Sequence, residues 1–366
     1  MRTITFQSVL YGVVRALGYD PARDLTAARA GTLCEYINQR VIEGWKFDFF
    51  PEWTVTEQRL YRAVYASATA YTATTEVYFY PTTQYYQALQ ASTGQAPALL
   101  QADGVTYYEN GAYWALSAAT YSASPWQPGI AYGVNSASNQ LPYQVQNPND
   151  GLCYQCIAAH TSGSSFDATK WGVLTPLDKY VGYDQTGLTA IGEVKLAARR
   201  NPKVRTNNPG YLDFVPSDNG VQFDWRAPNV VWLQFRRRPP VFTTTLYSSG
   251  TAYAAGVTVY DANGTGDCWT TTATTTAGQS PTSTPAKWSK VQFPAILGNF
   301  VKRAALSDAL RDQKQTDRAA EELTEAYAEL QDVQDRELAG QGQFDTASAQ
   351  VYGGGPARTG HWGRNC

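Results

Sequence analysis

An apolar periodicity over residues 293–339 constrains the fold of this chain more than any other feature. Apolar side chains recur three and four positions apart from Leu297 onward, which predicts one long amphipathic helix or two helices end to end. Pro294 suits the first helical turn, where no backbone donor is needed. A polar break lies at 312–317, and Gly340 is expected to end the run. A straight helix of this length would span roughly 60–70 Å, which few compact enzymes need.

The composition limits the classes of function. The 366 residues suffice for two or three domains, and the formal net charge of −2 argues neither for nor against a nucleic-acid partner. The chain has no run of about 18 apolar residues, so no membrane span is expected. The first six residues lack the apolar core of a signal peptide, so we expect cytosolic synthesis.

Residues that could carry chemistry are scarce. The lone Cys153-x-x-Cys156 pair lacks the further ligands of a structural zinc site, so we expect small buried side chains on a strand. Neither His160 nor His361 lies near a nucleophile motif, and the sequence contains no phosphate-binding or dinucleotide-binding loop. Carboxylate pairs for glycoside cleavage stay open. No catalytic, cofactor-binding or metal-binding residue is predicted, and an enzyme is the least supported class.

Two helices are expected near the N-terminus. The first covers 6–17 and is ended by Gly18. The second is capped by Asp24 and closed by Gly44. An aromatic-rich exit follows, and alternation around Trp53 predicts a strand. Further along, residues 178–242 alternate as antiparallel strands do, and Ser217-Asp218-Asn219-Gly220 is a strong hairpin signal.

The low-charge segments 63–176 and 243–287 contain an internal repeat. Each copy is expected to form a three-stranded unit of about 45 residues, near the lower limit for independent folding, with a tryptophan that locks its end onto the sheet. The matching residues of the three copies are Tyr71, Tyr86 and Trp114, then Tyr132, Tyr154 and Trp171, then Tyr253, Trp269 and Trp288.

This pattern resembles the small chitin-binding-type carbohydrate modules of extracellular glycosidases. The turns at 94–97 and 278–281 fit their Gly-x-x-Pro turn, but the aromatic pair that such modules present to a sugar is replaced at 91–92, 159–160 and 273–274. We therefore favour a surface decoration, with glycan binding as the alternative. The resemblance then gives the glycan contacts as Tyr132, Tyr154, Tyr253 and Trp269.

With the repeats set aside, the order of helices and strands resembles the head-to-tail adaptor (gatekeeper or tubular) proteins of tailed bacteriophages. The resemblance rests on 36–47, where a helix stops at Gly-Trp before an aromatic strand, on 231–240, and on the Phe-Val-Lys-Arg-Ala-Ala-Leu pattern at 300–306. It implies an α+β fold with a helical adaptor core (two N-terminal helices, a long C-terminal helix and antiparallel strands) and inserted small all-β modules. The predicted parts are a core at 1–62, 178–242 and 291–340, modules at 63–120, 121–177 and 243–290, and a flexible C-terminal arm at 341–366.

The same resemblance implies a place in the virion neck, between capsid and tail, for a protein made in the host cytoplasm. It implies a ring homo-oligomer, a dodecamer, that joins the portal protein to a tail or nozzle protein and extends the channel for double-stranded DNA. The predicted DNA-channel or portal contacts are the basic residues Arg199, Arg200, Lys203, Arg205, Arg236, Arg237 and Arg238. The alternatives are a solvated or ion-paired surface for these residues, and for the chain a glycan-binding protein or another tail tube or baseplate component.

Overall fold

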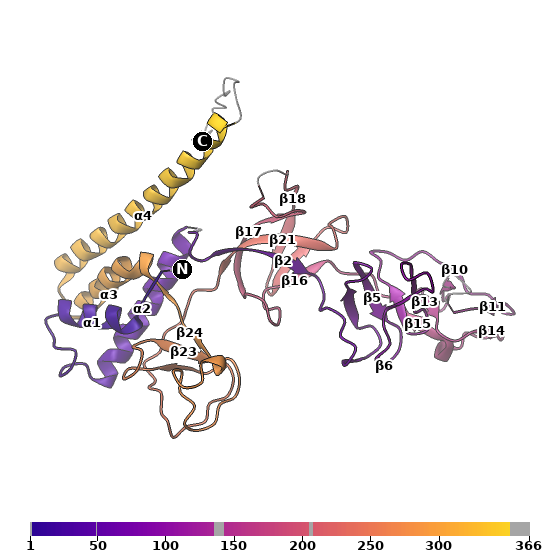
Figure 1. Cartoon of the computed structure of the whole chain (residues 1–366), viewed down its shortest axis with the longest axis horizontal. Coiled ribbons are helices and arrows are strands. Elements are labelled where there is room, and N and C mark those ends of the chain that lie inside the picture. Colours follow the sequence, from indigo (N-terminus) through magenta and orange to yellow (C-terminus); the bar gives the residue numbers. More distant parts are fainter. Residues whose placement is uncertain (1, 49, 135–142, 205–207, 352–366) are drawn as a thin grey trace. The chain divides into compact units, whose positions relative to one another are not determined.

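The computed structural model describes residues 2–48, 50–134, 143–204 and 208–351. Helices and small, mostly antiparallel sheets make it a mixed α+β chain, which confirms the predicted class in this coarse sense. The chain divides into two units, one formed by Met1–Thr54 and Arg238–Cys366 and the other by Val55–Arg237; Figure 1 labels their helices and strands. The residues predicted to form one core are thus divided between the two units.

The described part of the first unit contains four α-helices. They are α1 (Phe6–Ala16), α2 (Ala27–Phe47), α3 (Gly298–Asp312) and α4 (Thr316–Val351). The predicted first helix is confirmed, because its apolar face from Phe6 to Val14 is buried and Gly18 follows with a positive φ of 84°. One hydrophobic core joins all four helices, and Ile37, Phe300 and Ala326 are each at most 1 % exposed there.

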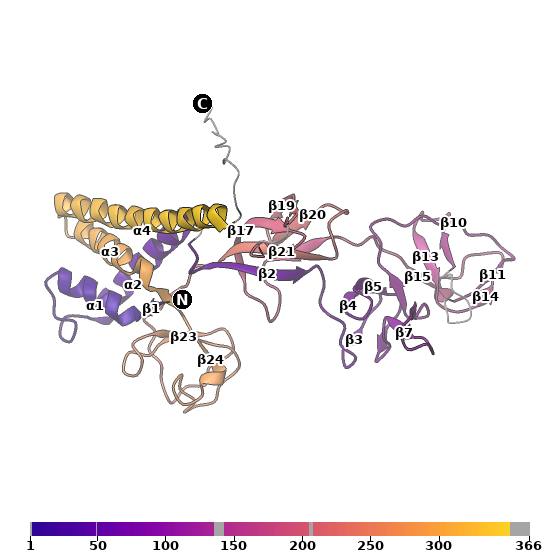
Figure 2. The same cartoon turned by 45° about the horizontal axis from the view of Figure 1, so that its top comes forward.

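The long apolar stretch forms a helical hairpin. Arg303 on α3 contacts Glu329 far along α4, whereas Ser307, one turn later on α3, contacts Ala319 near the start of α4. The two helices therefore run antiparallel, and both views show them side by side (Figures 1 and 2). The prediction of two helices end to end, or of one straight rod, is wrong. The polar break at 312–317 is a reversal, in which Lys314 adopts a positive φ of 61°.

Both ends of this stretch differ from the prediction. Phe293–Pro294 is not a first helical turn but a short strand, β25, which pairs with β1 (Thr3–Ile4). A 3₁₀ turn at Ala295–Leu297 then leads into α3. At the other end, Gly340 does not end α4, so the predicted extended arm is helical up to Val351. The rest of that arm, 352–366, lies outside the described residues.

The predicted ends of α2 are also wrong. Thr26, not Asp24, is the N-cap, and its hydroxyl accepts a hydrogen bond from the Arg29 amide at 3.3 Å. Gly44 lies inside the helix, where a Cβ would come within 2.9 Å of side-chain atoms of Leu297 and Phe300. This glycine allows α2 to approach α3 closely, and the helix continues to Phe47.

The predicted module at 243–290, called module 3 here, belongs to this first unit. Its sheet has the order β22-β23-β24, with strands β22 (Thr258–Tyr260), β23 (Cys268–Thr271) and β24 (Trp288–Lys290). Tyr260 packs edge-to-face on Phe6 of α1, with 5.4 Å between ring centroids, so module 3 shares the core of the helices.

Two sheets form the body of the second unit. The four-stranded sheet has the order β18-β17-β21-β2, and the three-stranded sheet has the order β16-β20-β19. Their apolar faces share one core around Val181, Val221 and Leu233, each 0 % exposed. The strand after Trp53 and the hairpin at 217–220 are confirmed. The strands are β2 (Thr54–Leu60), β16 (Tyr180–Gly182), β17 (Ile191–Ala198), β18 (Tyr211–Leu212), β19 (Phe214–Ser217), β20 (Gly220–Phe223) and β21 (Val230–Arg237).

Modules 1 and 2, predicted at 63–120 and 121–177, lie between β2 and β16 in sequence. Module 1 has β3 (Ala70–Tyr71), β4 (Glu76–Phe79), β5 (Gln84–Ala88), β6 (Ser92–Thr93), β7 (Ala98–Leu100), β8 (Tyr107–Glu109) and β9 (Trp114–Leu116). Module 2 has β10 (Ser124–Pro125), β11 (Ala131–Tyr132), β12 (Gln144–Gln146), β13 (Cys153–Cys156), β14 (His160–Thr161) and β15 (Trp171–Val173). Their central sheets are β4-β5-β9 and β10-β12-β13-β15.

The same contact recurs in all three modules and supports the internal repeat. In each, a tyrosine hydroxyl accepts a hydrogen bond from the backbone amide five residues earlier, at 2.8, 3.0 and 2.8 Å for Tyr71, Tyr132 and Tyr253. Each of these rings packs edge-to-face on the closing tryptophan, with centroids 5.3, 5.0 and 5.7 Å apart. This repeated packing of tyrosine on tryptophan gives each small module a defined core.

Candidate functional site

The predicted basic residues do not form one cluster. Arg199 and Arg200 follow the end of β17, and both are exposed, as is Lys203 in the next loop. Arg236 lies near the opposite end of the same ladder, because it pairs with Glu193 whereas Trp232 pairs with Ala198. Roughly 20 Å of strand separates the two groups at about 3.3 Å per residue. Arg205 lies outside the described residues.

Burial separates Arg236 from the other described basic residues of this set. Its guanidinium forms an ion pair with Glu193, and the residue is only 5 % exposed. Such a pair holds β17 to β21 and leaves little surface for a DNA phosphate. Arg237 and Arg238 are exposed, but the boundary between the two units falls between them.

The four predicted glycan contacts have two different roles. Tyr132 (7 % exposed) and Tyr253 are the core tyrosines of modules 2 and 3, so their rings serve folding. Tyr154 and Trp269 occupy equivalent positions on β13 and β23 and are half-buried. Their polar groups are held inside the module: the Tyr154 hydroxyl donates to Asp150 and the Trp269 Nε1 donates to Thr265, both at 2.8 Å.

Two buried glutamines join modules 1 and 2. Gln87 on β5 and Gln155 on β13 each follow the tyrosine of their central strand, and both are 0 % exposed. Gln155 Nε2 donates to Glu109 at 2.7 Å and to the Trp114 carbonyl at 3.2 Å, both in module 1. Gln87 Nε2 donates to the carbonyl of Val173 in module 2 at 2.8 Å. The exchange is reciprocal, so the two modules contact each other through the same face.

A glycine completes this contact. A Cβ on Gly172 would lie 2.6 Å from the Cβ of Leu89, so only glycine permits this separation of β15 from module 1. In module 3 the position of the two glutamines is Thr270, whose hydroxyl bonds that of Thr258 at 2.8 Å within the module. Sequence reasoning missed the contact, although Tyr-Gln-Ala at 86–88 and Tyr-Gln-Cys at 154–156 mark it in two of the three repeats.

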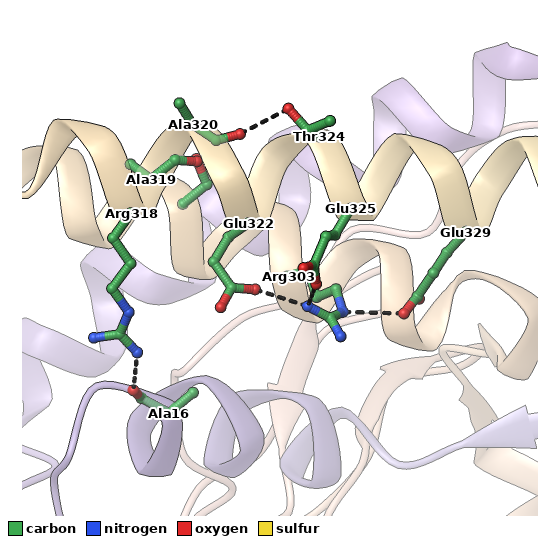
Figure 3. A network of polar contacts seen from close by, with 10 residues as sticks. Ala16, Arg303, Arg318, Ala319, Ala320, Glu322, Thr324, Glu325 and Glu329 are labelled. Atoms are coloured by element: carbon green, nitrogen blue, oxygen red, sulfur yellow. Dashed lines mark hydrogen bonds and ion pairs between the residues drawn. The ribbon is translucent and has the colours of Figure 1, made fainter.

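An acidic run on α4 is partly engaged in ion pairs within the first unit; its residues are Glu321, Glu322, Glu325, Glu329, Asp332 and Asp335. Arg303 of α3 forms ion pairs with Glu322 and Glu329 at 3.0 Å and also with Glu325, as Figure 3 shows. These three carboxylates fix the hairpin. Three others of the run, Glu321, Asp332 and Asp335, are exposed, and Asp332 pairs with Arg336 one turn later.

A second set of polar contacts attaches α2 to the hairpin. Arg40 binds Asp308 through two bonds of 2.7 and 2.6 Å and also binds Glu43 at 2.6 Å. Glu43 accepts a hydrogen bond from Tyr327 on α4. Further along, Gln334 donates to Asp48 at the end of α2, at 2.8 Å. The α3–α4 hairpin therefore packs on α2.

The described residues contain no group of three or more His, Cys, Asp or Glu side chains placed to hold a metal ion. Cys153 and Cys156 lie on β13 as predicted, and burial raises the pKa of the Cys156 thiol. Burial likewise raises the pKa of Cys268 to about 12 and that of Cys34 to about 11, which makes these thiols unreactive near neutral pH.

Among the described residues, none of the helices combines the length and hydropathy of a membrane-spanning segment. Comparison with known protein families and with curated proteins finds no match to this chain.

Proposed function

We propose that this chain is a virion structural protein: a head-to-tail adaptor that forms a ring between the portal and the tail of a tailed bacteriophage. The observation that carries the proposal is the length of α4. At 1.5 Å per residue, the 36 residues of α4 span roughly 54 Å, against about 22 Å for the 15 residues of α3. A helix this much longer than its partner suits a contact outside its own unit.

Among the residues whose side chains are described, α4 contacts the other helices as far as Gln334. Ala319, Ala326 and Leu330 are buried against the other helices, and Gln334 reaches the end of α2. The helix continues from there to Val351, roughly 25 Å further. In the proposed ring this segment contacts the portal protein.

The order of the elements along the chain supports the same proposal. Helices from both ends of the sequence form one core, as the resemblance to adaptors implies. Modules 1 and 2 lie between β2 and β16 in sequence, and neither of the two sheets of the second unit contains a strand from them, which supports the proposal that the modules are insertions. We regard the modules as decorations on the outside of the ring.

The set of basic residues proposed to contact DNA or the portal differs from the set that the sequence predicts. Arg199, Arg200 and Lys203 are exposed and remain proposed contacts with the DNA in transit or with an acidic portal surface. Arg236 is withdrawn from that set because its own side chain is buried and pairs with Glu193.

A glycan-binding protein is the second candidate. It is favoured by one observation, the half-buried aromatic rings of Tyr154 and Trp269 at equivalent positions of modules 2 and 3. A pull-down on chitin or peptidoglycan, with Tyr154→Ala and Trp269→Ala as controls, separates the two candidates. Another tail tube or baseplate component is a third candidate. Binding to the portal protein distinguishes an adaptor from such a component.

Binding to the portal protein of the same virus tests the proposal. The full chain is expected to co-sediment with portal rings. A chain truncated after Arg336 keeps the described contacts of α2, α3 and α4 and is expected to fold but to bind the portal at least tenfold more weakly. A full chain that stays monomeric and never associates with the portal would count against the adaptor function.

A further inference from the structure

A cavity of about 640 Å³ lies in the second unit where module 1 joins the four-stranded sheet. Its wall comes from β2, from the segment that leads into module 1, from β4 with its following turn, and from the loop at 184–188. The polar and aromatic side chains of this wall are Gln58, Arg62, Tyr78, Tyr80, Gln185 and Thr186. Its volume falls within the range of roughly 300–1,000 Å³ that is typical of small-molecule sites.

Module 1 is fixed against the sheet beside this cavity. The Tyr85 hydroxyl of module 1 accepts a hydrogen bond from the Tyr61 amide at 3.0 Å and donates to the Asn229 carbonyl at 2.5 Å. Asn229 in turn donates to the Thr83 carbonyl of module 1 at 3.0 Å. The two sides of the cavity are therefore held at a defined separation.

The polar part of the wall is held in place from behind. Gln185 Nε2 donates to the Leu60 carbonyl at 2.6 Å, and its Oε1 accepts from Arg59 at 3.4 Å. Arg59 is 0 % exposed and pairs with Glu57 at 2.8 Å. On the other side, Arg62 binds Glu76 through Nε at 2.7 Å. Such support reduces the ordering cost that a ligand would otherwise meet.

An exposed aromatic ring lies at this site. Tyr80 is 61 % exposed, and its ring stands edge-to-face on that of Tyr78, with 5.2 Å between centroids and 84° between planes. Leu188 (48 % exposed) and Val64 (38 % exposed) line the same cavity. A flat amphipathic ring among aliphatic side chains offers an apolar face to a ligand that also carries hydrogen-bonding groups.

We propose that this cavity binds a neutral saccharide, with one sugar ring against Tyr80. Sugar hydroxyls both donate and accept hydrogen bonds, and the Gln58 amide and the Thr186 hydroxyl do the same. The charge of Arg62 is balanced by Glu76, and Asp184 adds a carboxylate to the wall, so an anionic ligand is disfavoured. This site is separate from Tyr132, Tyr154, Tyr253 and Trp269 and does not depend on ring assembly.

Saturation-transfer NMR on the full chain tests the proposal. The probes are the methyl glycosides of glucose, galactose, mannose and N-acetylglucosamine at millimolar concentration, with glucuronic acid and choline as charged probes. At least one neutral glycoside is expected to bind. Tyr80→Ala should weaken that binding at least tenfold, and Thr186→Val should weaken it several-fold. Tyr211→Ala removes an equally exposed ring (69 %) elsewhere in the same unit and should change binding less than twofold.

Three results would overturn the proposal. The first is that none of the neutral glycosides receives saturation. The second is that a charged probe binds and the neutral ones do not. The third is that binding persists unchanged in both Tyr80→Ala and Thr186→Val. Tyr80 is mostly exposed and Thr186→Val preserves side-chain shape, so loss of binding in both variants, with unchanged circular dichroism, reports on the site.

Discussion

Replacing Gln155 by leucine should loosen the joint between modules 1 and 2. Leucine has nearly the same volume as glutamine, so the main effect is the loss of hydrogen bonds to the Glu109 carboxylate at 2.7 Å and to the Trp114 carbonyl at 3.2 Å. A buried bond to a charged group contributes about 1.5–3 kcal/mol and a neutral one about 1 kcal/mol. We therefore expect the variant to lose about 3 kcal/mol at pH 7.

The pH dependence of this loss gives a second, independent reading. Burial raises the pKa of the Glu109 carboxyl, and the hydrogen bond from Gln155 opposes that rise. The folded state therefore binds the Glu109 proton more tightly than the unfolded state does. As the pH rises above the ordinary glutamate pKa of about 4.3, loss of this proton lowers the free energy of unfolding. Without the Gln155 hydrogen bond, the Glu109 carboxylate destabilises the folded state more strongly. The destabilisation caused by Gln155→Leu should therefore fall at pH 4, where Glu109 takes up its proton, to about half of its value at pH 7.

Hydrogen exchange in the native full chain is the suitable assay, because a chain with two units need not unfold in one transition. The opening free energies of the amides in β9 and β13 report on the joint. Thr270→Val in module 3 changes the equivalent position, which bridges no second module, and should cost under about 1 kcal/mol. If Gln155→Leu leaves the exchange of both strands unchanged, or costs more at pH 4 than at pH 7, the reasoning about this joint is wrong.

Three further predictions concern the helices. Gly44→Ala forces a methyl group against the side chains of Leu297 and Phe300, which come within 2.9 Å, and should destabilise the first unit by about 1–3 kcal/mol. Gly31→Ala in the same helix meets nothing within 4 Å and should stabilise that unit by up to about 1 kcal/mol; thermal unfolding compares the two variants. Thr26→Ala should speed amide exchange in the first turn of α2 by removing about 1 kcal/mol, and Asp24→Ala should leave that turn unchanged. Arg303→Met should cost about 1 kcal/mol in urea unfolding at low salt, and a loss that persists undiminished at high salt would contradict an ionic origin.

The sequence predicted correctly those helices and turns that depend on residues close together in the chain. The stripe from Phe6 to Val14 predicts α1, because the same face that is apolar in sequence is buried in the fold. The hairpin at 217–220 follows from its turn residues in the same way. The repeats could be found because each copy needs the same tyrosine and tryptophan to close a very small core.

The wrong predictions concern residues whose local structure is determined by contacts with residues far away in the sequence. Gly44 looks like a helix end, but α3 requires it inside the helix. The reversal between α3 and α4 is centred on Lys314 at positive φ, a position that no glycine marks in the sequence. Asp24 and Thr26 are both good caps, and local pattern alone does not choose between them. The candidate sites were least predictable, since the cavity beside Tyr80 and the joint at Gln155 each combine segments far apart in sequence.

Electron cryomicroscopy of the neck of the assembled virion tests the central proposal most directly. We expect a ring of twelve 40.2 kDa chains directly below the portal, with α4 of each chain directed toward the portal and the modules on the outside. Density for this chain at the distal tail or on the baseplate, or a particle without density for this chain, would contradict the adaptor function.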